Sequence, residues 1–320
     1  MTVEEALLKV EDLRKYFPLR TGMLASILSK EQQHVKAVDG ITFHLASREI
    51  LGIVGESGCG KTTTGRTILR LTEPTSGSIY FEGIDLATMQ KSELRGIRRK
   101  MQMIFQDPYE SLNPRRTVTE TVGQSIDIHN LAASDDEKEA MIRKTLEEVG
   151  LEPPEEFVGC YPHVLSGGQR QRVAIARTLV LQPRLIVADE PVSMLDVSTR
   201  SGILELVMKL RDELGISVLY ITHDLATTRY VCNRFAVMYL GKIVELGDTD
   251  EVLENPIHPY TRALMSAVPV PDPTFKKKRE KIPGEAPSPI NPPSGCRFHT
   301  RCHFAKPECS RQEPSLEEFE

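Results

Sequence analysis

Apolar and polar residues alternate along the first part of the chain in a pattern that is typical of β-strands. Residues 7–13 alternate roughly, and residues 37–45 alternate around a turn expected at Val38-Asp39-Gly40. Between them, residues 19–34 are expected to form a surface loop. The short apolar run 49–54 is suited to a buried parallel strand. The N-terminal part is therefore predicted to be rich in strands.

The middle of the chain shows a helical pattern and then alternates between helices and strands. From about 107 to 165, five prolines interrupt a mostly helical stretch, with Ser134 as the expected N-cap of a helix that ends near Gly150. Strands that alternate with helices predict a mainly parallel sheet, so the fold class is α/β and 107–165 is a helical insertion. The expected helices and strands of the core lie, in chain order, at 168–181, 185–189, 198–214 and 217–222.

The last part of the chain, after residue 246, is rich in proline and cysteine. Such a segment cannot bury much core on its own, so we expect a linker and a small stapled appendage. We place the boundary between a main domain, 1–254, and a C-terminal region, 255–320. The basic run 276–279 in that region is expected to be solvated linker.

The composition changes this picture mainly by exclusion. Of 320 residues, 40% are apolar and 27% are charged, and no stretch approaches the ~20 apolar residues of a membrane span. Glu4 and Glu5 stand where a signal peptide would carry basic residues, so we expect a cytosolic chain. The net charge of -5 argues against general nucleic-acid binding. A role at a membrane would have to come through a partner that spans it.

One motif predicts a site for a nucleoside triphosphate. Glycines let backbone N–H groups turn toward a polyanion, and a helix that starts there adds positive potential. Lys61 is expected to bind the β- and γ-phosphates, Thr62 to ligate Mg²⁺, and Thr63 to contact the α-phosphate. A glycine-rich turn without a ligand is the alternative, but a full match after an apolar strand argues against it. The pattern G-x-x-x-x-G-K-[ST] is matched by Gly55, Glu56, Ser57, Gly58, Cys59, Gly60, Lys61 and Thr62.

Two adjacent acids at the end of another apolar strand predict the catalytic chemistry. Asp189 and Glu190 follow the run 185–188, and successive strand residues point to opposite faces, so the two carboxylates can have different roles. Asp189 is expected to support the Mg²⁺ shell, and Glu190 to orient and polarise the attacking water. An acid pair at a strand end is more often a helix cap, but the phosphate loop favours the catalytic interpretation.

The segment 165–172, Leu-Ser-Gly-Gly-Gln-Arg-Gln-Arg, resembles the LSGGQ signature of the ABC ATPase family. Three further positions follow in that family's order: Gln106 resembles its Q-loop glutamine, 193–196 its D-loop and His223 its switch histidine. The resemblance covers the chain through residue 247. It implies a P-loop NTPase core of the ABC type, with an N-terminal antiparallel β subdomain, the helical insertion and the Cys/Pro-rich C-terminal appendage.

The same resemblance implies how the site works. Two such domains, identical or paralogous, face each other head to tail and hold each ATP between one phosphate loop and the opposite signature. Gln106 would lie near Mg²⁺, and His223 would contact the γ-phosphate. Catalysis is thus expected from Lys61, Gln106, Glu190 and His223. The opposite ATP is expected to contact the signature residues Ser166, Gly167, Gly168 and Gln169.

An aromatic residue near the N-terminus should stack on the adenine ring in this family. Tyr16 and Phe17 are both candidates, and we favour Phe17. The alternative is that either ring is part of the hydrophobic core.

Further segments narrow the resemblance to the ATP-binding subunits of dipeptide and oligopeptide importers, dipeptide permeases above all. They imply a second ATPase subunit, two membrane permease subunits, an external peptide-binding protein and a place on the cytoplasmic face of the membrane. Residues 107–116 would lie near the permease. Import of nickel or another small solute is an alternative, as is a soluble ABC ATPase without a transport role. The resembling segments are 105–109, 111–114, 255–264 and 284–289.

The tail holds three closely spaced cysteines, Cys296, Cys302 and Cys309. Their spacing does not match a zinc-finger pair, although zinc is an alternative. Similar tails of peptide-importer subunits carry a four-cysteine iron–sulfur cluster, so the resemblance implies a [4Fe-4S] cluster that staples the tail. Its fourth ligand is not identified, with His303 as one candidate. Three unliganded thiols are the remaining alternative.

Overall fold

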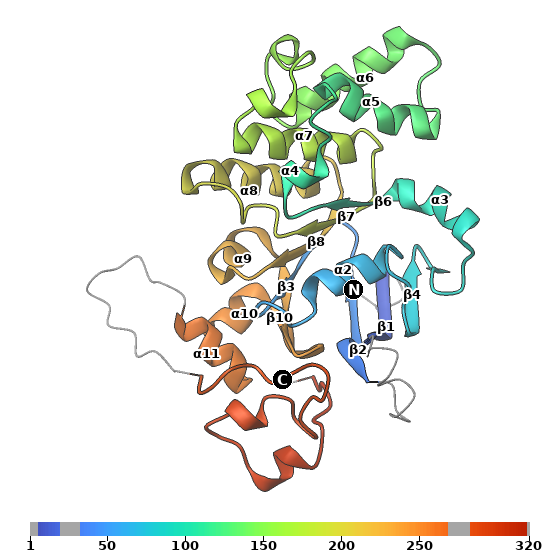
Figure 1. Cartoon of the computed structure of the whole chain (residues 1–320). Helices are drawn as coiled ribbons and strands as arrows, with labels where there is room; N and C mark the ends of the chain where they lie inside the picture. Colours follow the sequence, from blue (N-terminus) through green and yellow to red (C-terminus); the bar gives the residue numbers. More distant parts are fainter. Residues whose placement is uncertain (1–5, 20–32, 268–281, 319–320) are drawn as a thin grey trace. The chain divides into compact units, whose positions relative to one another are not determined.

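The computed structural model describes residues 6–19, 33–267 and 282–318. Most of the expected loop at 19–34 and all of the basic run at 276–279 lie outside these ranges. The chain forms two compact units, coloured by sequence in Figure 1. The first unit comprises Met1–Ala46, Leu51–Thr88 and Ile221–Glu320, and the second comprises Ser47–Ile50 and Met89–Tyr220.

The first unit begins with an antiparallel sheet, as the resemblance implied. Its strand order is β2-β1-β4-β5, and β1 pairs with both β2 and β4. Alternating residues of these strands are buried, among them Leu8, Val10 and Leu13 of β1. The strands are β1 (Leu8–Pro18), β2 (His34–Leu45), β4 (Ser76–Phe81) and β5 (Ile84–Asp85).

The turn expected at Val38-Asp39-Gly40 is wrong, because strand β2 runs through it. Leu13 pairs with Ile41 and Arg14 pairs with Asp39, so the register skips Gly40. Gly40 has a φ of 79°, which is typical of a bulge. The sequence pattern is typical of a turn, but in the structure the strand continues and Gly40 forms an irregularity in the pairing of β1 and β2.

The first unit also contains a group of strands that carries the phosphate motif. Strand β3 (Ile50–Val54) is parallel to β9 (Arg234–Tyr239), which is antiparallel to β10 (Lys242–Asp248). All five residues of β3 are buried, as expected of a parallel strand. The α-helices among the described residues of this unit are α2 (Lys61–Ile68), α9 (Leu225–Val231), α10 (Thr249–Glu254) and α11 (Pro259–Ala267).

The second unit has a parallel core and the predicted helical insertion. Strand β6 (Met101–Ile104) is parallel to β7 (Leu185–Asp189), and β8 (Ser217–Thr222) lies on the other side of β7. Both predicted strands, 185–189 and 217–222, are confirmed. The helices are α3 (Lys91–Lys100), α4 (Pro108–Ser111), α5 (Val118–His129), α6 (Asp135–Glu148), α7 (Gly167–Leu179) and α8 (Val197–Asp212).

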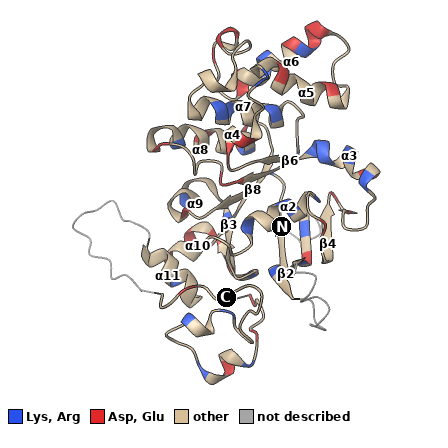
Figure 2. Cartoon of the chain, viewed as in Figure 1, with Lys and Arg blue, Asp and Glu red and all other residues tan. Residues whose placement is uncertain are grey.

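Local sequence signals explain where the insertion helices begin and end. The Ser134 hydroxyl accepts a hydrogen bond from the N–H of Glu137 at 3.2 Å, which confirms it as the N-cap of α6. Three acids in the first turn of α6 and three basic residues in the last turn of α3 complement the two helix dipoles (Figure 2). None of the helices in the described ranges is both long and apolar enough to cross a bilayer.

The C-terminal region buries more core than its composition suggested. Tyr260 of α11, Tyr239 of β9 and Phe298 are each at most 2% exposed. Their ring centroids lie 4.7 to 5.3 Å apart, at tilted or edge-on angles that aromatic pairs favour. The segment beyond α11 thus shares one hydrophobic cluster with strand β9. The domain boundary at 254 stays a prediction.

A buried ion pair also joins the C-terminal region to the N-terminal sheet. The Arg297 guanidinium donates to the Asp39 carboxylate of β2, and also to the Leu240 carbonyl at 2.8 Å. The Tyr16 hydroxyl donates to the same carboxylate. Burial disfavours the charged form of Asp39, but the Tyr16 hydrogen bond and the Arg297 charge outweigh it and lower the pKa of this carboxyl.

We predict that Asp39→Asn destabilises the protein by about 1.5–3 kcal/mol at neutral pH, since it removes a charged hydrogen-bond acceptor. The lowered pKa of Asp39 stabilises the fold above the ordinary value of 3.8, and this contribution is lost as the pH falls through the folded-state value. The difference from wild type in urea unfolding should therefore shrink as the pH is lowered toward about 3. A matched control is Asp12→Asn, whose carboxylate is 63% exposed and should cost less than about 1 kcal/mol. A difference in unfolding free energy between the wild type and Asp39→Asn that does not change with pH would contradict the lowered pKa of Asp39.

Candidate nucleotide-binding and catalytic site

The phosphate loop, residues 55–62, connects strand β3 to helix α2, as its pattern requires. Gly60, the N-cap of α2, has a φ of 111°. A Cβ atom at Gly60 would lie 2.1 Å from the Ala37 carbonyl oxygen, and one at Gly55 would lie 2.2 Å from that of Met238. Only glycine fits at these two positions, because the loop backbone packs directly on its neighbours.

Lys61 is buried at the start of α2 and is held by the loop itself. Its ammonium group donates to the carbonyl oxygens of Gly55 at 2.8 Å and Glu56 at 2.9 Å. The same group lies 3.8 Å from the Cys59 sulfur, and burial raises the pKa of that thiol although the Lys61 charge opposes the shift. Thr62 and Thr63 follow in the first turn of α2. The loop thus concentrates one cation and a helix N-terminus in the same place.

Glu56 of the loop has partners that sequence analysis missed. Its backbone N–H donates to the Tyr260 hydroxyl at 3.0 Å, and its carboxylate accepts from Arg301. These partners are 204 and 245 residues away along the chain, so no spacing rule could have paired them.

The two candidates for adenine stacking differ in exposure. Tyr16 is fixed by its hydroxyl, and burial together with the hydrogen bond to Asp39 raises the pKa of this phenol to about 12. Phe17 is 39% exposed, with the Lys15 ammonium 4.7 Å from its ring centroid. An exposed ring can offer a face to a base, so Phe17 stays the favoured residue.

Strands β6 and β7 bring two predicted catalytic residues together. Because parallel strands end at the same edge of a sheet, Gln106 and Glu190 meet just beyond them. The Gln106 Nε2 donates to Glu190 Oε2 at 3.0 Å. Asp189, one residue earlier, is 2% exposed, whereas Glu190 is half-buried, so the two acids differ in exposure.

Glu190 has an unusual backbone conformation. Its φ is 47°, in the left-handed region that residues other than glycine rarely adopt. Both the backbone N–H and the hydroxyl of Ser193 donate to its carbonyl oxygen, at 3.1 and 3.0 Å. Strained positions of this kind concentrate at functional sites, where surrounding contacts hold them.

The signature segment begins helix α7. Ser166 is the N-cap, and its hydroxyl accepts from the Gln169 N–H at 3.3 Å while the Gln169 side chain accepts from the Ser166 N–H at 2.9 Å. This is a capping box, which the Ser-x-x-Gln spacing could have predicted. A Cβ at Gly168 would lie 3.4 Å from Thr199, and one at Gly167 would lie 3.5 Å from Leu195. The phosphate contact expected of these residues stays a prediction.

His223 and the cysteines complete the predicted residues. His223 is exposed directly after β8, next to Asp224, which caps helix α9. The Cys302 and Cys309 sulfurs each accept a backbone N–H at 3.4 Å, as sulfur ligands often do. However, no group of three His, Cys, Asp or Glu side chains in the described ranges could hold a metal ion. The predicted iron–sulfur cluster is therefore not supported by the arrangement of ligands.

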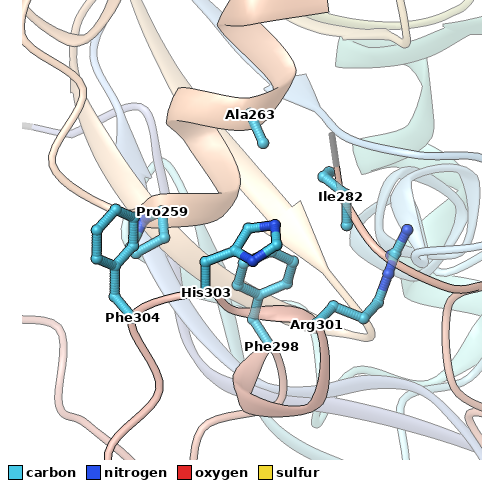
Figure 3. Close-up of a pocket in the computed structure, with 7 residues that line it drawn as sticks. All are labelled: Pro259, Ala263, Ile282, Phe298, Arg301, His303 and Phe304. Carbon is cyan, nitrogen blue, oxygen red and sulfur yellow. The ribbon is translucent and has the colours of Figure 1, made fainter. Parts of the chain in front are cut away.

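A small cavity is lined by residues of α11 and of the tail segment 298–304 (Figure 3). Its volume is about 20 Å³, which is room for about one water molecule and too small for a nucleotide or a peptide. The residues that line it include Phe298, Arg301, His303 and Phe304.

Two family models match the chain. The model described as "ABC transporter" matches residues 38–193, and "Oligopeptide/dipeptide transporter, C-terminal region" matches residues 244–309. The oligopeptide transport ATP-binding protein AppF of Bacillus subtilis is 48% identical over 318 residues, which is 98% of this chain and 94% of AppF. OppF of Escherichia coli, with the same description, is 46% identical over 315 residues, or 98% of this chain and 93% of OppF.

Solved structures agree with these relatives. The dimeric ATP-binding cassette MJ0796, in a post-hydrolysis state bound to ADP and Pi, is 31% identical with a TM-score of 0.65, covering 76% of this chain and 98% of that one. The cbiO1 protein of Clostridium perfringens, part of the ABC transporter complex cbiONQ, is 28% identical with a TM-score of 0.67, covering 79% and 92%. The predicted α/β fold of a P-loop NTPase is confirmed. The chain belongs to the ABC transporter ATP-binding proteins, within the oligopeptide/dipeptide transport family.

Proposed function

We propose that this chain hydrolyses ATP at the phosphate loop and the strand-end acids described above. Lys61 binds the β- and γ-phosphates, and Thr63 contacts the α-phosphate. The oxygen donors of Thr62, Gln106 and Asp189 are the type that Mg²⁺ prefers, and they are the proposed ligands. The metal, when bound, neutralises charge that develops on the phosphates.

Glu190 is the proposed general base for the attacking water. The observation that carries this role is the 3.0 Å hydrogen bond from Gln106 to Glu190, which orients the carboxylate at the end of β7. His223 is proposed to contact the γ-phosphate, and Phe17 or Tyr16 to stack on adenine.

We further propose that hydrolysis drives peptide import through a membrane permease. Similarity over 98% of the chain to oligopeptide transport proteins supports this cargo. Two ATPase subunits would close on two ATP molecules, each contacted by the opposite signature at 166–169. The pair would sit on the cytoplasmic face of the membrane under two permease subunits, which residues 107–116 would contact, and a peptide-binding protein would deliver the cargo.

We predict that Glu190→Gln lowers ATP hydrolysis by at least about 100-fold, because the amide cannot accept the proton of the attacking water. Binding of ATP should change little, since the substitution keeps the shape and the hydrogen bond to Gln106. Turnover of purified protein and equilibrium ATP binding measure the two effects. The matched control is Glu213→Gln, an exposed glutamate at the end of α8, which should hydrolyse ATP at the wild-type rate. Normal turnover by Glu190→Gln would remove the proposed role.

The cargo is tested by uptake of labelled di- and oligopeptides into cells that express either the wild-type chain or Glu190→Gln. Loss of uptake in the variant, with the permease subunits still in the membrane, is the expected result. Unchanged uptake in cells that have no other peptide importer would overturn the peptide assignment. Nickel uptake is then the next assay.

The iron–sulfur cluster of the tail is a separate proposal, which rests on the three cysteines within the matched C-terminal region, 244–309, and not on the arrangement of their side chains in this structure. We predict that protein purified without oxygen is coloured and holds about four iron atoms per chain. Cys302→Ser should lower the iron content, whereas Cys160→Ser, a cysteine of the second unit, should not. A colourless, iron-free wild-type protein would eliminate the cluster.

A further inference from the structure

The Arg301 guanidinium makes five hydrogen bonds, two of which go to the phosphate loop. It is 8% exposed and bonds both oxygens of the Glu56 carboxylate, at 3.0 and 3.4 Å. It also donates to the Tyr239 hydroxyl at 3.3 Å and to the carbonyls of Pro283 at 3.2 Å and Gly284 at 3.3 Å. A guanidinium has five N–H groups, so every donor of Arg301 is used.

The same loop residue is held a second time through its backbone. The N–H of Glu56 donates to the hydroxyl of Tyr260, whose ring is completely buried and contacts both Tyr239 and Phe298. The carbonyl of Glu56 accepts from the Lys61 ammonium at 2.9 Å. The C-terminal region is therefore connected to the phosphate-binding lysine through one residue.

The negative charge of Glu56 explains why its pairing with Arg301 matters for phosphate binding. A carboxylate in a loop that binds phosphates repels the ligand, and the repulsion is strongest where the site excludes water. A bidentate arginine neutralises the carboxylate and fixes its direction at once. Arg301 is 245 residues from Glu56 along the chain and comes from the segment that holds the tail cysteines.

We propose that Arg301 is a positioning residue for nucleotide binding, which sets the phosphate loop by pairing with Glu56. This inference rests on the proposed function of the loop. The C-terminal region then determines phosphate affinity without touching the nucleotide. Loss of Arg301 should therefore weaken ligand binding by an amount that depends on the phosphate charge of the ligand and on the presence of the Glu56 carboxylate.

The test measures the dissociation constants of ATP, tripolyphosphate and adenosine for the full-length chain by calorimetry. We expect Arg301→Met to weaken binding of ATP and tripolyphosphate about tenfold, because the negative charge of Glu56 in the phosphate loop is then uncompensated. Adenosine, which has no phosphate, should be affected less than twofold. Arg301→Lys keeps the charge without the bidentate geometry, so its affinities for ATP and tripolyphosphate should lie between those of the wild type and of Arg301→Met.

Rescue by a second substitution distinguishes positioning from a general loss of structure. Adding Glu56→Gln to Arg301→Met removes the uncompensated charge and should restore tripolyphosphate binding to within about threefold of wild type. The matched control is Glu313→Gln, which breaks another ion pair of the tail, the 2.6 Å contact with Lys242, and should leave all three constants unchanged. No recovery in the double variant, or equal losses for adenosine and tripolyphosphate, would overturn the inference. If Arg301→Met does not fold, the same cycle is run with Arg301→Lys.

Lys61→Ala separates this inference from the proposed function. If Lys61→Ala binds tripolyphosphate as wild type does, the proposed phosphate site is wrong and the inference falls with it. If Lys61→Ala loses binding but Arg301→Met keeps it, only the inference is overturned.

Discussion

The close packing of the phosphate loop against its own neighbours is the constraint on which the rest of the site depends. The Gly55 and Gly60 backbones approach the Met238 and Ala37 carbonyls so closely that a Cβ atom could not be inserted. This contact fixes where the loop leaves β3 and where helix α2 begins. Because α2 begins there, Lys61 is buried and can reach the loop carbonyls. A backbone arranged in this way can surround a polyanion without side chains in the way.

Burial of charge follows from that packing and explains the pairs around the loop. Lys61 is compensated by carbonyl oxygens, Arg301 by Glu56, and Arg297 by Asp39. A buried charge that lost its partner would be costly, so each pair restricts where its elements can lie. The aromatic cluster around Tyr260 adds the apolar contacts that hold the C-terminal region in position. Charge pairing specifies the contacts, and apolar burial stabilises them.

Local patterns in the sequence predicted much of this fold. Strands β7 and β8 were predicted to the residue, because each contains a continuous apolar run, 185–188 and 218–221, between clear boundaries. Ser134 identified the start of α6, since N-capping depends only on nearby residues. The Gly40 bulge was not predicted, because a glycine with positive φ serves a turn and a bulge equally well. What decided between them was the partner strand, which local pattern does not describe.

The candidate site shows the same contrast between residues that sequence patterns identify and contacts that depend on distant parts of the chain. The family resemblance identified Gln106, and the acid pair after an apolar strand identified Glu190; the two side chains meet at 3.0 Å beyond the ends of two parallel strands. Sequence patterns could not identify the partners of Glu56, because neither a tyrosine in a helix nor an arginine near cysteines indicates which distant residue it contacts. Their arrangement depends on a tail that folds back onto strand β9 through Phe298. The prediction of a stapled appendage was based on the prolines and cysteines of that tail, but three aromatic side chains in one cluster decide how it packs. A phosphate site that sequence motifs describe as local is thus completed by residues from the far end of the chain.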